Sequence, residues 1–163
     1  MLEQAGGDII TVGVAEWQVA RSPGVIRTTL GSCVGVVLYA SQFQAGGMAH
    51  ILLGEPPPGK IIHRGKYART AIEGLVNELG RLGVASTDLE AAIIGGASLF
   101  DGLDTPFLNR IGPGNIDAAR AALEKMKINI KREEVGGKSG RTISLYLDDG
   151  RIELRTGSET RTL

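Results

Sequence analysis

Glycine content limits the possible folds of this chain more than any other feature. The sequence holds 24 glycines among 163 residues but only seven aromatic residues, and glycine pairs begin at positions 6, 46, 95 and 136. Glycine is unfavourable inside helices and supplies the positive φ angles that many tight turns need. The pattern therefore favours short strands joined by tight turns over a bundle of helices.

The segments between these turns alternate between helix-like and strand-like patterns. One helix is expected over residues 65–82, where apolar residues recur at helical spacing, and a second is expected to begin at Asn115, a favourable N-cap residue. Strand candidates rich in β-branched and apolar residues occur at 9–15, 25–29, 33–40, 48–53, 89–98, 128–135, 142–149 and 151–156. These elements predict one α/β (α+β) domain over 1–163, a layered sandwich of mixed sheet with two main helices packed on it. Its core spans about 9–156, and the polar ends are expected to fray.

Charge and hydropathy argue against several functions. The formal net charge is zero, and the densest run of charges, KREE at 131–134, neutralises itself, so no nucleic-acid partner is expected. No apolar run approaches the roughly 18 residues of a membrane span, and the first ten residues lack the basic start of a signal peptide. A single cysteine can form neither an internal disulfide nor a cysteine-based zinc site. We therefore expect a cytoplasmic protein that does not insert into membranes.

The single cysteine, Cys33, is a candidate nucleophile. It follows Gly31 and Ser32 and precedes a β-branched apolar run. A nucleophilic thiol needs a nearby base and donors for the oxyanion that forms, and a sharp turn at Gly31 would direct the amides of Ser32 and Cys33 toward a substrate carbonyl. The alternative is a buried thiol that behaves as a small hydrophobe.

His50 is the better candidate for the base. It lies in an apolar strand that can pair antiparallel with the strand beginning at Cys33, because the connection between them is short. The other histidine, His63, follows a proline-rich loop at an expected exposed helix entry. Thr28 and Thr29 are the nearest polar side chains that could orient the imidazole. The alternatives without a catalytic role are that His50 is a hydrogen-bonded core residue and that the two threonines are present because threonine favours strands.

Longer stretches around these residues resemble a known family. PGVIRTTLGSCVGVVLYA followed by GGMAHILL resembles the CheD family of chemoreceptor glutamine deamidases. The resemblance continues through GKYARTAIEGLVNEL, AAIIGGASLF, IGPGNIDAARAAL and EEVGGKSGRTISLYLDDGRIELR, in order, over roughly residues 9 to 156. The family is similar in fold to cysteine-dependent toxin deamidases, which implies a layered α/β sandwich with the cysteine and histidine at one edge.

The resemblance implies a role for each candidate residue. Cys33 would be the nucleophile, His50 the base and Thr28 the third catalytic residue, with Thr29 as the alternative for that position. The reaction implied is hydrolysis of a glutamine side-chain amide through a thioester, which releases ammonia and requires neither a metal nor an organic cofactor.

The implied substrate is a protein, a methyl-accepting chemotaxis receptor, so the site should be open and shallow. Gly31, Ser32 and Phe100 are the expected substrate-binding residues, and the loop 101–114, which includes Phe107, is a candidate rim. The alternative for both phenylalanines is that they fill the core.

Other functions predict different observations. Transglutaminase-like transfer would use an amine in place of water, and a redox-sensing thiol would not need His50. A non-enzymatic adaptor that binds receptors and a CheC-type phosphatase, as some members of the family do, would be expected to lose Cys33 or His50. Both residues are present, which favours the enzyme.

Overall fold

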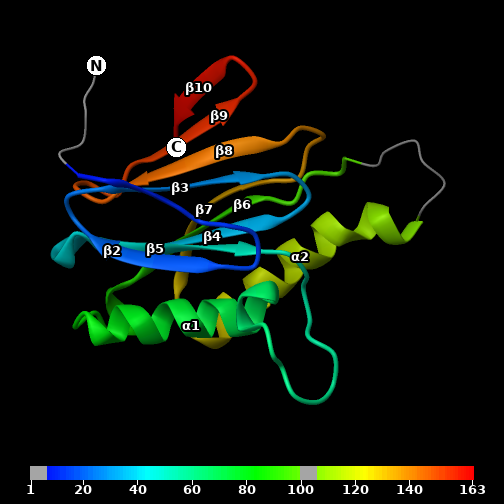
Figure 1. Ribbon diagram of the computed structural model, residues 1–163, viewed down its shortest axis with the longest axis horizontal. Helices are drawn as coiled ribbons and strands as arrows, with labels where there is room; N and C mark the ends of the chain where they lie inside the picture. The colour runs from blue at the N-terminus through cyan, green and yellow to red at the C-terminus, as the bar shows by residue number, and fades with distance from the viewer. Residues whose placement is uncertain (1–6, 100–105) are drawn as a thin grey trace.

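The computed structural model describes residues 7–99 and 106–163, with the backbone alone described for 106–111. In these described residues, ten strands form two five-stranded sheets that pack face to face, and two helices cover the outer face of one of them (Figure 1). This three-layer α+β sandwich confirms the predicted fold class. The division of the strands into two sheets was not anticipated.

The first sheet has the strand order β1–β3–β8–β9–β10. Its strands are β1 (Ile9–Thr11), β3 (Val25–Leu30), β8 (Arg141–Tyr146), β9 (Ile152–Thr156) and β10 (Glu159–Thr162). β1 pairs parallel with β3, and the remaining pairs are antiparallel. β8 and β9 form the hairpin predicted from the DDG turn.

The second sheet has the order β2–β5–β4–β6–β7. Its strands are β2 (Trp17–Arg21), β5 (Ala45–Ile51), β4 (Val34–Ala40), β6 (Glu90–Gly95) and β7 (Asn129–Val135). β4 and β5 are antiparallel neighbours, as predicted, and only β6 and β7 pair parallel in this sheet.

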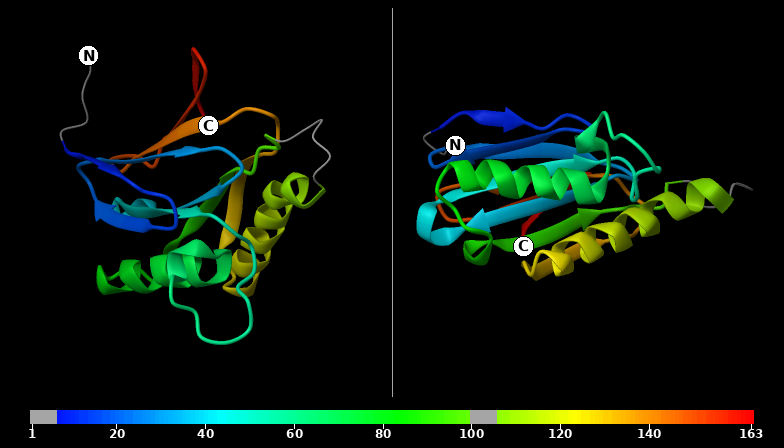
Figure 2. Two further views of the ribbon diagram at one scale, coloured as in Figure 1. Left: turned by 45° about the vertical axis from the view of Figure 1, so that its right-hand side comes forward. Right: turned by 90° about the horizontal axis from the view of Figure 1, so that it is seen from below.

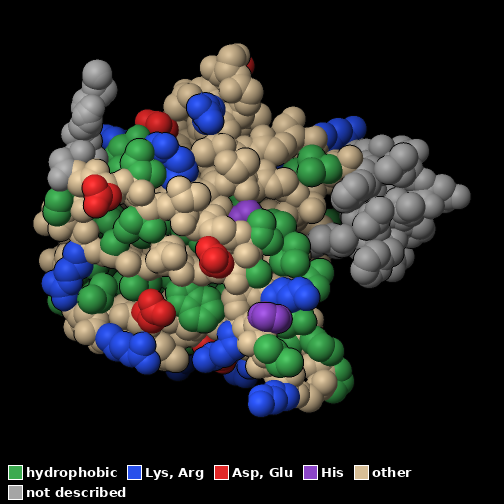
Figure 3. Space-filling model, viewed as in Figure 1, with side chains coloured by type: hydrophobic (Ala, Val, Ile, Leu, Met, Phe, Trp, Pro, Cys, Tyr) green, Lys and Arg blue, Asp and Glu red, His purple; other side chains and the backbone are tan. Residues whose placement is uncertain are grey.

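Helices α1 (Ala68–Arg81) and α2 (Pro106–Lys125) lie side by side against the second sheet (Figure 2). Three short 3₁₀ helices, η1 (Ser41–Phe43), η2 (Arg64–Lys66) and η3 (Ser86–Asp88), occupy connections. None of the helices among the described residues combines the length and the apolar character needed to cross a bilayer. Basic and acidic side chains are interspersed over the face drawn in Figure 3.

The central strand β4 is buried on both faces because the second sheet lies between the helices and the first sheet. Val34, Val36 and Leu38 pack toward the helices, whereas Val37 belongs to the core between the two sheets. Successive strand residues point to opposite faces. The layer arrangement therefore explains why this segment is apolar without alternation.

The second helix begins at Pro106, so the prediction of an N-cap at Asn115 is wrong. Asn115 lies inside α2, is buried, and donates from Nδ2 to the Leu52 carbonyl at 3.0 Å. At Gly112, a Cβ would lie 2.5 Å from the carbonyl oxygen of Gly96. Gly112 and Asn115 are poor helix formers, but they allow close contacts with other parts of the chain. Helix propensity therefore does not predict that this segment is helical.

Two strands were not predicted, β2 and β10. In β2, Trp17 packs over Gly74 of α1 and donates from Nε1 to Glu78 at 3.0 Å. β10 lies in the segment expected to fray, but it pairs with β9, and Arg161 makes two bonds of 2.9 and 3.0 Å to the Glu134 carboxylate of β7. The C-terminal segment is therefore attached to both sheets.

Candidate active site

Cys33 lies in the short turn by which the chain passes from β3 in the first sheet to β4 in the second. The turn is held by the glycine-rich end of β6: Gly96 N–H donates to the Cys33 carbonyl at 2.8 Å, and Ala97 N–H donates to the Gly31 carbonyl at 3.2 Å. Gly95 has a φ of 102°, and a Cβ there would lie 2.6 Å from the Cys33 carbonyl oxygen. Only glycine fits this position, so the AIIGGAS motif fixes the main chain of the candidate nucleophile.

The Cys33 side chain is half-buried and packs against the core between the sheets. Burial raises the pKa of the Cys33 thiol, because the thiolate is less well solvated there. The resting group is therefore a neutral thiol that needs a base to become nucleophilic.

His50 lies on the same side of the second sheet as Cys33. It is directly opposite Gly35 of β4, and Cys33 lies two residues before Gly35, immediately before the first paired residue of β4. Met48, two residues before His50, packs in the same core against which Cys33 packs. Both side chains therefore lie in the layer between the sheets, because Cys33 packs against this core and His50 is hydrogen-bonded to Thr28 of the first sheet.

Thr28 reaches His50 from the opposite sheet. It is buried on β3, and its Oγ1 lies 2.8 Å from His50 Nδ1 and 2.8 Å from the carbonyl oxygen of Val12. A hydroxyl has one proton and a carbonyl can only accept, so Thr28 donates to Val12 and accepts from Nδ1–H of His50. The unprotonated nitrogen of the neutral ring is therefore Nε2, which is free to accept a proton.

Burial lowers the pKa of His50, which keeps the imidazole neutral. A neutral thiol and a neutral imidazole whose Nε2 is unprotonated are the two groups that general-base activation of a cysteine requires.

The main chain around His50 is held by a turn that sequence reasoning missed. Ala15 N–H donates to the His50 carbonyl at 2.9 Å, and His50 N–H donates to the Glu16 carbonyl at 3.0 Å. Together with the Val12 carbonyl, these contacts place residues 12–16 behind the histidine and the threonine. These contacts involve only backbone atoms, which residues of every type provide. No sequence motif therefore indicates them.

The remaining candidates take different positions. Thr29 is exposed and shares a 2.9 Å hydrogen bond with Thr142, on the face of β3 away from His50. His63 is exposed at the start of η2. Phe100 lies outside the described residues, as does part of the loop 101–114, and only the backbone of Phe107 is described.

Two amides in the turn, of Ser32 and Cys33, are candidate donors to an oxyanion. Gly31 and Ser32 are half-buried next to Cys33. Within the described ranges, the N–H groups of Ser32 and Cys33 donate to no protein acceptor, although both neighbouring carbonyls, of Gly31 and Cys33, are bonded to the end of β6. Free N–H groups beside a nucleophile are what an oxyanion requires.

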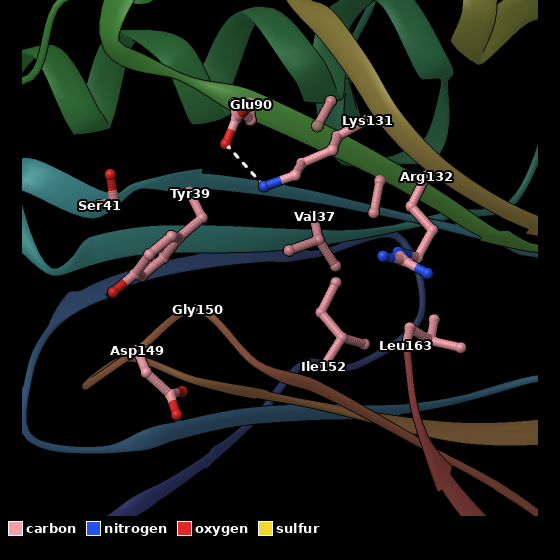
Figure 4. Close-up of a pocket in the computed structure, with 12 residues that line it drawn as sticks. Val37, Tyr39, Ser41, Glu90, Lys131, Arg132, Asp149, Gly150, Ile152 and Leu163 are labelled. Atoms are coloured by element: carbon pink, nitrogen blue, oxygen red, sulfur yellow. Dashed lines mark hydrogen bonds and ion pairs between the residues drawn. The ribbon is translucent and has the colours of Figure 1, made fainter.

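A cleft of about 210 Å³ lies elsewhere, at the other end of β4 (Figure 4). It is lined by apolar residues of both sheets, including Val37 and Ile152, and by Lys131, which pairs with Glu90 at 3.5 Å. Cys33, His50 and Thr28 do not line it. The candidate active site is therefore separate from this cleft. In the part of the chain that the structure describes, no three His, Cys, Asp or Glu side chains gather as a metal site would require.

The fold and the site define a class: an α+β sandwich with a thiol, an imidazole and a hydroxyl between two sheets. Comparison with known proteins identifies the family. The family model "CheD chemotactic sensory transduction" matches residues 54–156. The chain belongs to the CheD family, which confirms the resemblance seen in the sequence.

Two curated relatives illustrate the similarity. The chain is 39% identical over 155 residues to the "Probable chemoreceptor glutamine deamidase CheD" of Methanococcus maripaludis, covering 95% of this chain and 99% of the relative. It is 40% identical over 152 residues to the "Chemoreceptor glutamine deamidase CheD" of Halalkalibacterium halodurans, covering 91% of this chain and 94% of the relative. The Bacillus licheniformis hypothetical protein YfiH is a structural neighbour at 15% identity and a TM-score of 0.44, covering 70% of this chain and 47% of that one. That score is too low to establish a shared fold.

Proposed function

We propose that this chain is a chemoreceptor glutamine deamidase that uses Cys33, His50 and Thr28. Membership of the CheD family, in which near full-length relatives carry this name, supports the activity. The observation that carries the mechanism is the hydrogen-bonded chain from Val12 through Thr28 to His50 Nδ1, which leaves Nε2 as a base beside the only cysteine.

The first half-reaction forms a thioester. Sγ of Cys33 attacks the glutamine carboxamide carbon while Nε2 of His50 takes the thiol proton. The amides of Ser32 and Cys33 donate to the oxyanion. The C–N bond then breaks as the imidazolium returns its proton to the leaving nitrogen, which departs as ammonia.

The second half-reaction restores the enzyme. His50 Nε2 removes a proton from water, and the hydroxide formed attacks the thioester carbon. The C–S bond breaks, the Cys33 sulfur regains a proton from the imidazolium, and the product is glutamate. The net reaction adds one water to one amide and yields one carboxylic acid and one ammonia.

Thr28 orients the ring in both steps. When Nε2 accepts a proton, the Nδ1–H···Oγ1 bond joins a charged donor to a neutral acceptor and becomes stronger. The Val12 carbonyl prevents the hydroxyl from turning its proton toward the ring. The exposed position of Thr29 and its hydrogen bond to Thr142 support Thr28 over Thr29 for this role.

The test is deamidation of a purified chemoreceptor cytoplasmic fragment, followed by peptide mass. We expect a gain of about one dalton at particular glutamines with wild-type protein, and no gain with Cys33→Ala or His50→Ala. His63→Ala is the matched control and should retain full activity, because His63 is exposed and does not belong to the hydrogen-bonded chain of Val12, Thr28 and His50. Ammonia should appear in equal amount when no amine is added, which separates hydrolysis from transglutaminase-like transfer. Full activity of His50→Ala would contradict the mechanism.

Binding of a CheC-type phosphatase is a separate proposal that rests on the family resemblance. Calorimetric titration of the Cys33→Ala variant with a purified CheC-type phosphatase tests it, because binding should not depend on the thiol. Absence of heat at micromolar concentrations of both proteins would contradict it.

A further inference from the structure

We propose that Gly65 and Glu16 are positioning residues for the reaction. Both hold the main chain of residues 12–16, which connects β1 to β2, and through this connection they fix the imidazole of His50 against the hydroxyl of Thr28. The inference rests on the proposed function and adds two residues that the proposed mechanism does not use. Neither residue needs to touch the reacting atoms, because each acts through the backbone of the connection.

The 12–16 connection leads from the first sheet to the second and bonds to a candidate catalytic residue in each (Figure 1). At its start, the Val12 carbonyl accepts the proton of the Thr28 hydroxyl at 2.8 Å. At its end, Ala15 N–H donates to the His50 carbonyl at 2.9 Å, and His50 N–H donates to the Glu16 carbonyl at 3.0 Å. The position of the hydroxyl relative to the ring therefore depends on the shape of this connection.

The shape of the connection is not one that the chain adopts readily by itself. Ala15 has a φ of 64°, in the left-handed region that residues with a side chain rarely occupy. Such a conformation persists only where surrounding contacts hold it. The connection therefore needs support from its neighbours to keep its two ends in place.

Gly65 supports the connection from η2. It is buried, and a Cβ built on it would lie 2.1 Å from the Ala15 carbonyl oxygen, so only a residue without a side chain allows the two main chains to approach this closely. The segment around Gly65 is itself fixed. The Lys66 carbonyl accepts from the first two amides after β5, at 3.1 and 2.9 Å, and the Thr70 hydroxyl of α1 donates to the Arg64 carbonyl.

Glu16 supports the connection from within. Its carboxylate accepts from Gly13 N–H at 2.9 Å, and its own N–H donates to the Gly13 carbonyl at 3.1 Å. These two bonds close a turn that begins directly after Val12. Because the carboxylate is exposed, we expect a smaller contribution from Glu16 than from the buried contact at Gly65.

A role in stability alone and a role in positioning predict different states of the His50 ring. The bond between Nδ1–H and the Thr28 hydroxyl determines that the neutral ring carries its proton on Nδ1. If the connection shifts, this bond weakens and the proton also occupies Nε2, which then cannot accept the thiol proton. A substitution that lowers only the unfolding free energy leaves the tautomer unchanged.

The first test is NMR of the imidazole nitrogens in a histidine-labelled sample at about pH 8, where the ring is neutral. Every sample carries His63→Ala, so that His50 is the one remaining histidine. We expect protonation at Nδ1 in this background and a measurable shift toward Nε2–H after Gly65→Ala or Glu16→Ala. Glu16→Gln keeps an acceptor for Gly13 N–H and should restore the Nδ1–H tautomer. An unchanged tautomer in both alanine variants would overturn the inference.

The second test is deamidation of the receptor fragment. Gly65→Ala should lower kcat about tenfold to hundredfold and Glu16→Ala about threefold, both with little change in KM. Gly46→Ala is the matched control for lost stability, because its Cβ would lie 2.6 Å from the Leu38 carbonyl oxygen, at the end of β5 away from His50. It should lower the unfolding free energy in urea but leave kcat and the tautomer at the parent values. An equal fall in kcat in this control would overturn the inference.

The two tests also separate the inference from the proposed function. If Gly65→Ala does not fold, Glu16→Ala and its Glu16→Gln rescue decide the question with the same measurements. A tautomer that shifts in both alanine variants of a protein without deamidase activity would overturn the proposed function but support control of the ring by these residues. Normal deamidation with full kcat in both variants would overturn the inference and leave the proposed function in place.

Discussion

At the scale of single residues, burial shifts the pKa values of the two candidate catalytic groups in opposite directions. It lowers the pKa of His50 and raises the pKa of Cys33, so the neutral pair persists over a wide pH range. A base with a lowered pKa stays unprotonated to lower pH, so kcat/KM should begin to fall only below the ordinary histidine value of about 6.5. At high pH, kcat/KM should fall above the raised pKa of Cys33. A thiolate and a neutral imidazole together hold no proton that could be transferred to the leaving nitrogen. A kcat/KM profile measured from about pH 5 to about pH 10 checks both limbs, and an acid limb above pH 6.5 would contradict the neutral pair.

The Thr28 hydroxyl gives the second prediction at this scale. Thr28→Val keeps the shape of the side chain but removes the acceptor for Nδ1–H and leaves the Val12 carbonyl unpaired. A hydrogen bond to a charged group contributes about 1.5–3 kcal/mol, so kcat should fall about tenfold to hundredfold with little change in KM. Thr28→Ser should restore most of the activity. Thr29→Val is the control, since its hydroxyl contacts Thr142 instead, and an equal loss in that variant would contradict the assignment.

At the scale of elements, the glycine-rich end of β6 determines where Cys33 lies. Gly95→Ala would place a Cβ against the Cys33 carbonyl at a φ of 102°, and both conflicts involve backbone that cannot yield cheaply. We expect a loss of about 2–4 kcal/mol in unfolding free energy, together with a lower alkylation rate of Cys33. Gly80→Ala on the exposed part of α1 meets no atom within 4 Å and should be neutral or stabilising. Urea unfolding of the two variants makes the comparison, and equal stability would show that the β6 end does not constrain the turn.

Sequence patterns predicted the elements whose structure depends on the local sequence. They failed for elements whose structure depends on packing against distant parts of the chain. The apolar periodicity of α1 and the short link between β4 and β5 were sufficient to predict that helix and that strand pair. Asn115 led to a wrong predicted start of the second helix. Its side-chain amide does not cap a helix but donates a hydrogen bond to the Leu52 carbonyl. β2 and β10 escaped notice because β2 is half-buried without alternation and β10 is exposed along its length, so neither shows the period of a two-faced strand.

At the scale of the whole molecule, the candidate site spans two sheets. Thr28 belongs to the first sheet and His50 to the second, and Cys33 lies in the turn between them. The sequence indicated the candidate residues and, through the family resemblance, the role proposed for each, with Thr28 and Thr29 left as alternatives. It could not supply the Val12 carbonyl or the separation into two sheets, because both depend on contacts between distant segments. The alignment of the two sheets should therefore affect catalysis more than the packing of the helices does.

Two isoleucines of equal burial test this expectation. Ile143 of β8 lies opposite Thr28 in the register and faces the second sheet, whereas Ile93 of β6 faces the helices; both are fully buried. Ile→Val at either position should lower the unfolding free energy by about 0.5–1.5 kcal/mol. Only Ile143→Val should also lower kcat, by about twofold to fivefold, because small displacements of reacting groups reduce the rate. Urea unfolding and receptor-fragment deamidation, measured on the same preparations, separate the two effects. An equal fall in kcat for Ile93→Val would show that the helix layer supports the site as strongly as the packing between the sheets.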